Sequence, residues 1–196
     1  MHDVNSDEIA PSTEMRRFPK FSIIVPAKNE ALVVGRLLSR LVELDYPKER
    51  YEVLIIEDGS SDETAQIGRD YETKFPRLVR FCHGEVSKGK PRALNLGLGL
   101  AGGEIIGVMD ADNVPRRDFL RRAAGYFGDA DVVALQCLGC GINGEESIVA
   151  KICSYEEAAW FRPCMLGKER LGLFIPLTGS CEFIRREFLQ EVGGWD

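Results

Sequence analysis

Two aspartates one residue apart, Asp110 and Asp112, directly follow the largely apolar run 104–109. Carboxylates held this close repel each other unless an opposite charge neutralises them. A divalent cation that prefers hard oxygen ligands can do so, particularly when substrate phosphates complete its coordination. The pair therefore predicts a metal–nucleotide site, although a strand end followed by an ordinary Asp/Asn turn would have the same sequence pattern.

A second acidic pair, Glu57 and Asp58, ends the apolar run 51–56. At such a position Asp58 can accept hydrogen bonds from a ribose or from the N–H of a base. The alternative is that acids favour the N-terminus of the following helix, worth about 0.3–1 kcal/mol each. That alternative fits Asp62 and Glu63 better than the first pair, because Glu57 and Asp58 lie further from the expected helix.

Three cations, Lys88, Lys90 and Arg92, surround the expected start of another helix. Cations are unfavourable at a helix N-terminus, so a bound anion such as a diphosphate explains their position better than folding does. A solvated basic face is the alternative. The segment 25–30 also joins a strand end to a helix start, where free N–H groups could receive a base or a phosphate, or simply be capped.

The elements that must position these side chains alternate along the chain. Short apolar runs predict strands, and helical spacing of apolar residues predicts the helices between them, with Asn29 and Ser60 as N-terminal caps. The expected strands are 21–25, 51–56, 78–81, 104–109, 131–136 and 181–184; the expected helices are 30–42, 60–74, 91–100, 115–127 and 145–160, with a helical turn at 187–192 and irregular chain at 163–179. This alternation predicts an α/β, Rossmann-like fold: a mainly parallel sheet with helices on both faces and ligands beyond the carboxyl ends of the strands.

The composition sets the wider bounds. The chain has 196 residues, 44% of them hydrophobic and 29% charged, and a net charge of −6. This length fits one domain, predicted at 21–196, after a polar leader at 1–20 that we expect to be mobile. The negative charge argues against nucleic acid as a partner. No apolar run approaches the roughly 18–20 residues that span a bilayer, so this chain alone is expected to be soluble.

The cysteines are predicted to be buried, reduced thiols. Cys137 and Cys140 have the spacing of half a zinc site, but the remaining cysteines provide no second close pair. The six are Cys82, Cys137, Cys140, Cys153, Cys164 and Cys181.

Taken in order, the motifs resemble those of family 2 glycosyltransferases of the GT-A fold. The resembling segments are 22–30, 57–62, 89–95, 110–112 and 178–196. Each motif is weak alone, whereas the ordered set over about residues 20–196 is specific. The stretch from Gln136 to Ser180 is most similar to the membrane-associated, polysaccharide-forming branch that includes cellulose and chitin synthases.

The resemblance implies transfer of a sugar from a nucleoside-diphosphate donor, UDP-sugar being favoured, to a polysaccharide or lipid-linked acceptor, with inversion at the anomeric carbon. It implies Mg²⁺ or Mn²⁺ as cofactor, with Asp112 the direct ligand and Asp110 beside it. The implied donor-binding residues are Pro26, Ala27, Glu30, Glu57, Asp58, Lys90, Arg92, Asp110, Ala111 and Asp112, and Gly179 and Ser180 shape the acceptor side.

Two departures from the family pattern matter. Glu182 stands in a position where small residues are usual after the Gly-Ser pair, and it could contact the acceptor or point to solvent. The general base of these enzymes is a carboxylate that the resemblance places beyond Asp196, so the chain is interpreted as an N-terminal part of a longer catalytic domain. The parent protein would then lie on the cytoplasmic face of a membrane, attached through segments outside this chain.

Two other functions remain open. A non-catalytic nucleotide-sugar-binding module would retain the acidic pair and lack the base. A nucleotidyltransferase would also bind a metal–nucleotide complex, but many of those carry a glycine-rich phosphate loop near the first strand, which 25–30 lacks.

Overall fold

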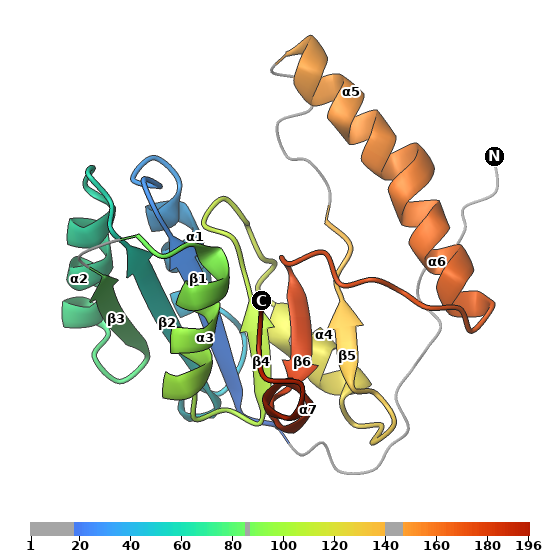
Figure 1. The fold of residues 1–196 in the computed structure, drawn as a ribbon, viewed down its shortest axis with the longest axis horizontal. Coiled ribbons are helices and arrows are strands. Elements are labelled where there is room, and N and C mark those ends of the chain that lie inside the picture. Colours follow the sequence, from blue (N-terminus) through green and yellow to red (C-terminus); the bar gives the residue numbers. More distant parts are fainter. Residues whose placement is uncertain (1–17, 85–86, 140–146) are drawn as a thin grey trace.

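The computed structural model describes residues 18–84, 87–139 and 147–196. Within them lies one six-stranded sheet of order β3-β2-β1-β4-β6-β5 (Figure 1). Its strands are β1 Phe21–Ala27, β2 Tyr51–Asp58, β3 Val79–Gly84, β4 Ile105–Val108, β5 Ala134–Gln136 and β6 Glu182–Arg185. The helices are α1 Val34–Val42, α2 Thr64–Lys74, α3 Lys90–Leu100, α4 Phe119–Tyr126, α5 Ile148–Glu156, α6 Arg162–Arg170 and α7 Arg186–Glu191, with a 3₁₀ turn at Lys48–Arg50 and a π-helical turn at Glu157–Phe161.

The first four strands are parallel, as the alternation of elements predicts. Ile23 of β1 lies between Val53 of β2 and Gly107 of β4, and β3 continues the parallel set beside β2. Strand β6 is antiparallel to both of its neighbours, β4 and β5. The carboxyl ends of β1, β2 and β4 therefore share one edge of the sheet, which is where the polar motifs follow.

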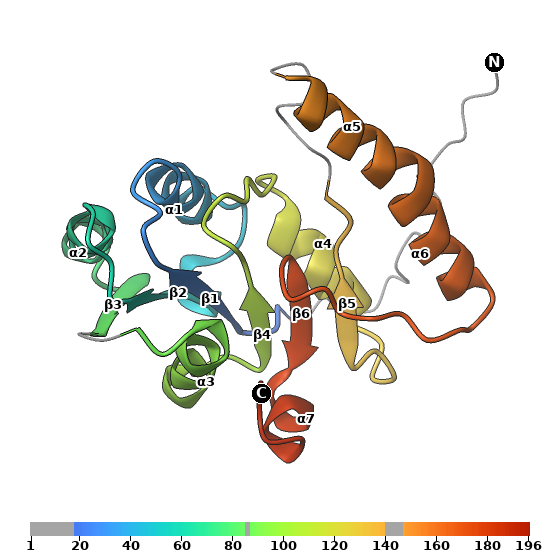
Figure 2. The ribbon, with the colours of Figure 1, turned by 45° about the horizontal axis from the view of Figure 1, so that its top comes forward.

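Helices cover both faces of the sheet (Figure 2). Successive side chains of a strand point to opposite faces, so Ile23 and Ile24, both fully buried, belong to different cores. The Ile23 side packs against α1 and α4, and the Ile24 side packs against α3 and α7. Full burial of one such aliphatic side chain contributes about 1.5–3 kcal/mol, so these two cores fix the helices that carry the site.

A glycine sets how closely α3 approaches the sheet. A Cβ at Gly97 would lie 2.6 Å from Cγ2 of Ile24. A side chain here would push the helix off β1, because atoms in a close-packed core have little room to yield. Gly97 therefore helps to hold the basic start of α3 over the carboxyl edge.

The two predicted helix caps are wrong. Helix α1 begins only at Val34 and α2 at Thr64, and neither has a side-chain cap hydrogen bond. Asn29 instead adopts a left-handed conformation with φ of 57°. Its N–H donates to Ser60 Oγ at 3.0 Å, and its Oδ1 accepts from Ser61 N at 2.9 Å, so the two residues join neighbouring loops to each other.

The prediction of irregular chain at 163–179 is also wrong for the first half of that segment. Helices α5 and α6 and the π-helical turn between them form a continuous helical arm from 148 to 170 that extends away from the sheet (Figures 1 and 2). Pro163 lies where the π-helical turn meets α6, and the regular i→i−4 hydrogen bonding that a proline would break is already interrupted there. Several large apolar side chains of the arm are exposed, including Ile148, Ile152 and Trp160.

None of the helices in the described ranges is both long enough and apolar enough to cross a bilayer. The predicted leader lies outside the described residues except for 18–20, and so does Cys140. The other five cysteines are free thiols, as expected, but their predicted burial is wrong: Cys153 is exposed and the other four are half-buried.

Candidate functional site

The acidic turn and the basic helix start meet at the carboxyl edge of the parallel strands. Lys90 Nζ, from the first turn of α3, lies 2.5 Å from Oδ1 of Asp110, which follows β4. The two side chains remain 43% and 38% exposed. Each can therefore turn toward a ligand, because an exposed ion pair of this kind is worth only about 0–1 kcal/mol.

Asp112 is more exposed than Asp110 and points away from the core. Its Oδ1 accepts a long hydrogen bond of 3.3 Å from Asn113 Nδ2, and its carbonyl oxygen accepts from Arg36 Nη2 at 3.2 Å. Ala111 between the two aspartates is buried and packs into the core beneath the turn. The turn thus anchors itself through Ala111 and presents both carboxylates outward.

Asp58, at the end of β2, holds the loop that leads into α3. Its carboxylate accepts hydrogen bonds from Ser87 Oγ at 2.7 Å and from the N–H groups of Lys88 and Gly89 at 2.8 and 2.9 Å. Burial opposes ionisation, but these bonds and the charge of Lys28 outweigh it and lower the pKa of Asp58 below its ordinary value. Asp58 therefore remains ionised at neutral pH and positions the basic helix start.

Glu57 points the other way, into the protein. It is 1% exposed, and its two carboxylate oxygens bond to Ser60 N and to His83 Nδ1. These partners tie the end of β2 to the following loop and to β3. The structure gives Glu57 a supporting position at the edge, and its contact with a donor stays a prediction.

The loop after β1 completes this edge. Ala27 is buried and Pro26 half-buried. The N–H of Glu30 donates to Thr64 Oγ1 at 2.7 Å, which holds Glu30 near the acidic turn. Partial burial, and next the charges of Asp112 and Asp110, raise the pKa of Glu30.

The raised pKa of Glu30 leads to a prediction about stability. A carboxyl whose folded pKa exceeds its unfolded pKa destabilises the folded state once the pH rises above those values. Glu30→Gln should therefore raise the free energy of unfolding at pH 7, and the difference should vanish below about pH 4, where both states are protonated. Urea unfolding at the two pH values measures this, and an equal difference at both would contradict it.

The predicted acceptor side lies beside the acidic turn. Gly179 has a φ of 80°, and its N–H donates to Glu182 Oε2 at 2.8 Å. Glu182 is 2% exposed, so it neither points to solvent nor lies open to an acceptor but holds the loop from beneath. Gln136 of β5 holds the same loop from the side, accepting from Thr178 N at 2.8 Å and donating to the carbonyl oxygen of Ser180 at 3.0 Å.

The C-terminal Gly-Gly-Trp-Asp segment packs against α3. Asn95 Oδ1 accepts from Trp195 N at 2.9 Å, and its Nδ2 donates to the carbonyl oxygen of Trp195 at 2.6 Å. Gly194 has a φ of 89°, and a Cβ there would lie 2.2 Å from Asn95 Oδ1. The glycine and the asparagine, 99 positions apart in sequence, are therefore parts of one contact.

The carboxylate oxygens of Asp110 and Asp112 suit a hard divalent cation that is also coordinated by a substrate. Asp110 and Asp112 present two carboxylates at this edge, and after burial their charges are the next causes that raise the pKa of Glu30. Carboxylate oxygens are the ligands that Mg²⁺ and Mn²⁺ prefer. Within 18–84, 87–139 and 147–196, no group of three or more His, Cys, Asp or Glu side chains is arranged to hold a metal, so phosphate and water oxygens would complete the coordination.

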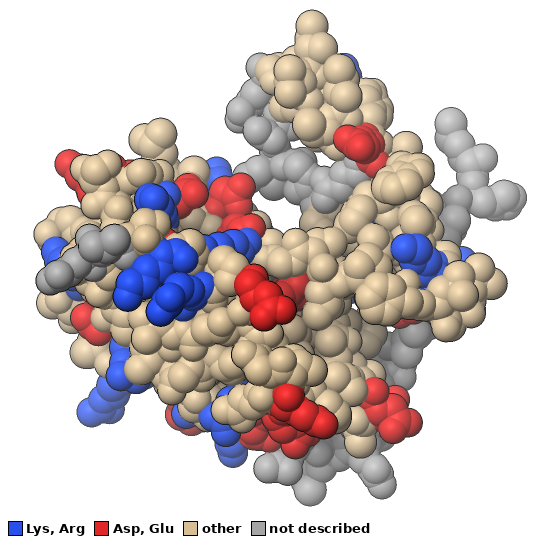
Figure 3. Space-filling model, viewed as in Figure 1, with Lys and Arg blue, Asp and Glu red and all other residues tan. Residues whose placement is uncertain are grey.

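Basic side chains gather on the face that carries α3 (Figure 3). Lys88, Lys90 and Arg92 are all exposed there.

We expect Arg92→Ala to weaken nucleotide binding about three- to tenfold at low salt and less at high salt, because exposed charges are screened. Calorimetric titration at two salt concentrations measures this.

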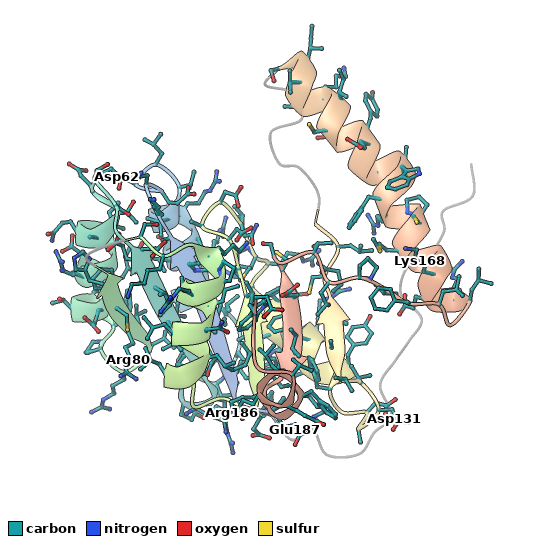
Figure 4. The ribbon with its side chains drawn as sticks, viewed as in Figure 1. Asp62, Arg80, Asp131, Lys168, Arg186 and Glu187 are labelled. Carbon is teal, nitrogen blue, oxygen red and sulfur yellow. The ribbon has the colours of Figure 1, made fainter. Side chains whose placement is uncertain are left out.

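The matched control for Arg92 is Arg80→Ala. Arg80 is also exposed, but it projects from the opposite end of the sheet (Figure 4). The control should leave nucleotide affinity unchanged. Equal affinities for the Arg92 variant and the unsubstituted chain would place Arg92 on a solvated face without ligand contact.

Most of the residues predicted for the site lie along this one edge, in three neighbouring loops and the start of α3. Sequence reasoning missed Asn113, whose side chain joins the acidic turn to the acceptor-side loop. The signal available was its place directly after the acidic pair. It also missed the supporting roles of Gln136 and Asn95, which depend on contacts between distant segments.

Comparison with known proteins agrees with this arrangement. The model of the family Glycosyl transferase family 2 matches residues 22–193. The chain is 36% identical over 183 residues to the beta-monoglucosyldiacylglycerol synthase of Synechocystis sp., covering 91% of this chain and 37% of that protein. It is 31% identical over 189 residues to the poly-beta-1,6-N-acetyl-D-glucosamine synthase of Staphylococcus epidermidis, covering 94% of this chain and 44% of that protein.

A solved structure shares the fold. The mannosyltransferase PcManGT from Pyrobaculum calidifontis, in complex with GDP-Man and Mn²⁺, superimposes with a TM-score of 0.79 at 26% identity and covers 96% of this chain and 50% of that one. The chain thus spans half or less of each of these proteins. The predicted GT-A architecture is confirmed, and with its motifs in family order along one sheet edge the chain belongs to glycosyl transferase family 2.

Proposed function

We propose that the chain is the donor-binding part of an inverting, metal-dependent glycosyltransferase. The observation that carries the proposal is the contact of 2.5 Å between Lys90 Nζ and Asp110 Oδ1. It brings a basic helix start, which favours phosphate, against an acidic turn, which favours a cation. A nucleoside diphosphate with its cation combines these two charges in one ligand.

Each part of the edge has a role in holding that ligand. The loop after β1, with Pro26, Ala27 and Glu30, lines the nucleoside, and Asp58 contacts it while keeping the helix start in place. Lys90 and Arg92 bind the diphosphate by charge. The two aspartates, Asp112 directly and Asp110 beside it, hold Mg²⁺ or Mn²⁺.

The chemistry follows from what the edge can stabilise. When bound, the cation would offset the negative charge that develops on the departing nucleoside diphosphate. Lys90, whose side chain is 43% exposed, can turn from Asp110 toward the leaving phosphate. Inversion also requires a general base to take the proton of the acceptor hydroxyl. We assign no residue of this chain to that step and expect the base beyond Asp196.

The donor is a nucleoside-diphosphate sugar. UDP-sugar is favoured by the family resemblance, and GDP-sugar is the alternative because the neighbouring mannosyltransferase structure holds GDP-Man. The acceptor is a lipid or polysaccharide, in keeping with the names of the two relatives, a glucosyldiacylglycerol synthase and a poly-N-acetylglucosamine synthase. In the whole protein we place the domain at the cytoplasmic face of a membrane, as the polysaccharide-forming branch implies.

Thermal unfolding with added nucleotides tests the proposal. A ligand at 100 times its dissociation constant stabilises the folded state by about 2.7 kcal/mol. We expect UDP or GDP to raise the unfolding temperature with Mn²⁺ and much less without it. An equal rise with ADP, or no rise with any nucleotide, would contradict the proposal. Metal-dependent binding by the whole protein without sugar transfer would identify a non-catalytic binding module instead.

A further inference from the structure

The side chain of Asn113 lies between the acidic turn and the acceptor-side loop. Its Oδ1 accepts from Asp110 N at 3.0 Å, from Ser180 Oγ at 2.9 Å and from Cys181 Sγ at 3.1 Å. Its Nδ2 donates to Asp112 Oδ1 at 3.3 Å. One amide therefore contacts both metal-side aspartates and two residues of the opposite loop.

Three of these groups form a closed triangle. Asp110 N also donates to Ser180 Oγ at 3.2 Å, and that hydroxyl donates onward to Asn113 Oδ1. A hydroxyl that accepts from one partner and donates to the next has its proton direction fixed. The orientation of Ser180 is thus set by the acidic turn.

The strand register explains why these two loops meet. Val108, the last residue of β4, pairs with Glu182, the first residue of β6. The acidic turn leaves β4 at the same edge from which the acceptor-side loop enters β6. Glu182 and Gln136 bond to the other side of that loop. Asn113 joins the loop to the acidic turn, together with the direct bond of 3.2 Å from Asp110 N to Ser180 Oγ.

We propose that Asn113 is a positioning residue that couples donor and acceptor sides, setting the acidic turn for a cation–diphosphate and Ser180 for the acceptor through one amide. The inference rests on the proposed function, because it assigns ligands to both loops. A substitution at Ser180 on the acceptor side should therefore weaken donor binding through the shared network of Asn113, Ser180 and Asp110 N.

A double-mutant cycle tests this coupling. Calorimetry measures the Mn²⁺-dependent affinity for UDP and GDP in the unsubstituted chain, in Asn113→Ala, in Ser180→Ala and in the double variant. We expect a loss of about tenfold for Asn113→Ala and about threefold for Ser180→Ala. The double variant should lose little more than Asn113→Ala alone, because residues in one network are not additive.

Two further variants separate positioning from general damage. Asn113→Asp keeps the accepting oxygen but loses the N–H that donates to Asp112, and we expect it to bind the metal–nucleotide several-fold more tightly than Asn113→Ala. Ser39→Ala removes a hydroxyl that donates to Gly35 O in α1, away from the site, and should leave affinity unchanged. Metal-free thermal unfolding of each variant verifies that it is folded.

The outcomes distinguish the inference from the function on which it rests. If the unsubstituted chain binds nucleotide normally, either additive losses or an unchanged affinity of Asn113→Ala would overturn the coupling alone. Absence of nucleotide binding by the unsubstituted chain would overturn both.

Discussion

Asp112→Asn is expected to remove metal-dependent nucleotide binding, lowering affinity in the presence of Mn²⁺ by at least about 100-fold, equivalent to about 2.8 kcal/mol. The substitution keeps the size of the side chain but removes the charge that a hard cation requires. Because Asp112 is exposed, the fold should be affected by no more than about 0.5 kcal/mol. Calorimetric titration with UDP and GDP, with and without Mn²⁺, measures the loss.

Asp131→Asn is the matched control for this experiment. Asp131 is also exposed but lies at the opposite end of the sheet from the carboxyl edge (Figure 4). It should bind nucleotide as the unsubstituted chain does. If Asp112→Asn retained its Mn²⁺-dependent affinity for nucleotide, the assignment of this aspartate to the metal would be wrong.

Asp58→Ala is expected to cost about 2–4 kcal/mol of unfolding free energy and to weaken nucleotide binding as well. The carboxylate accepts three hydrogen bonds from the segment 87–89, and bonds to a charged group contribute about 1.5–3 kcal/mol each before the loop relaxes. Releasing this segment frees the start of α3, so the cations it carries should lose their position over the edge. Urea unfolding and nucleotide titration of the same variant measure both effects.

The stability effect should depend on pH in a defined direction. The folded-state pKa of Asp58 is lowered, so its contribution is present above the ordinary carboxyl pKa of about 4 and is lost as the pH falls through the folded value. The difference between the variant and the unsubstituted chain should therefore be full at pH 7 and shrink progressively as the pH falls below about 4. Asp70→Ala, which removes an exposed carboxylate bonded within α2 to Gln66, should show a small effect at either pH. Equal stability of the Asp58 variant at pH 7 would show that the loop is held by other contacts.

Much of this architecture can be predicted from the sequence because it depends on local patterns. Apolar runs mark β1, β2 and β4, and the residues that follow them fall at one edge once the strands are parallel. The meeting of Lys90 with Asp110 follows from that topology. The antiparallel β6 and the short β5 do not, because their direction is set by pairing between distant segments.

The predictions that were wrong have specific physical causes. Asn29 and Ser60 are good capping residues by type, but hydrogen bonds between their two loops compete with capping and prevail. Pro163 suggests a break in the helix, yet the arm continues past it, because the π-helical turn before α6 replaces regular α-helical hydrogen bonding at that point. Asn113 and Glu182 were not identified as supports of the site, because their partners lie across the sheet edge or inside the protein.

A structure of the chain with Mn²⁺ and UDP, or with GDP if UDP does not bind, would show where the diphosphate and the cation lie. We predict the diphosphate between the acidic turn and the start of α3, with the cation on Asp112 and Lys90 turned from Asp110 toward phosphate. The alternative place for the nucleotide is a hollow of about 440 Å³ lined by Arg40, Arg116, Arg117 and Asp118 among others, in which Arg116 and Arg117 already pair with Asp118 and Glu43. Nucleotide bound there, with the Asp112 carboxylate uninvolved, would contradict the account.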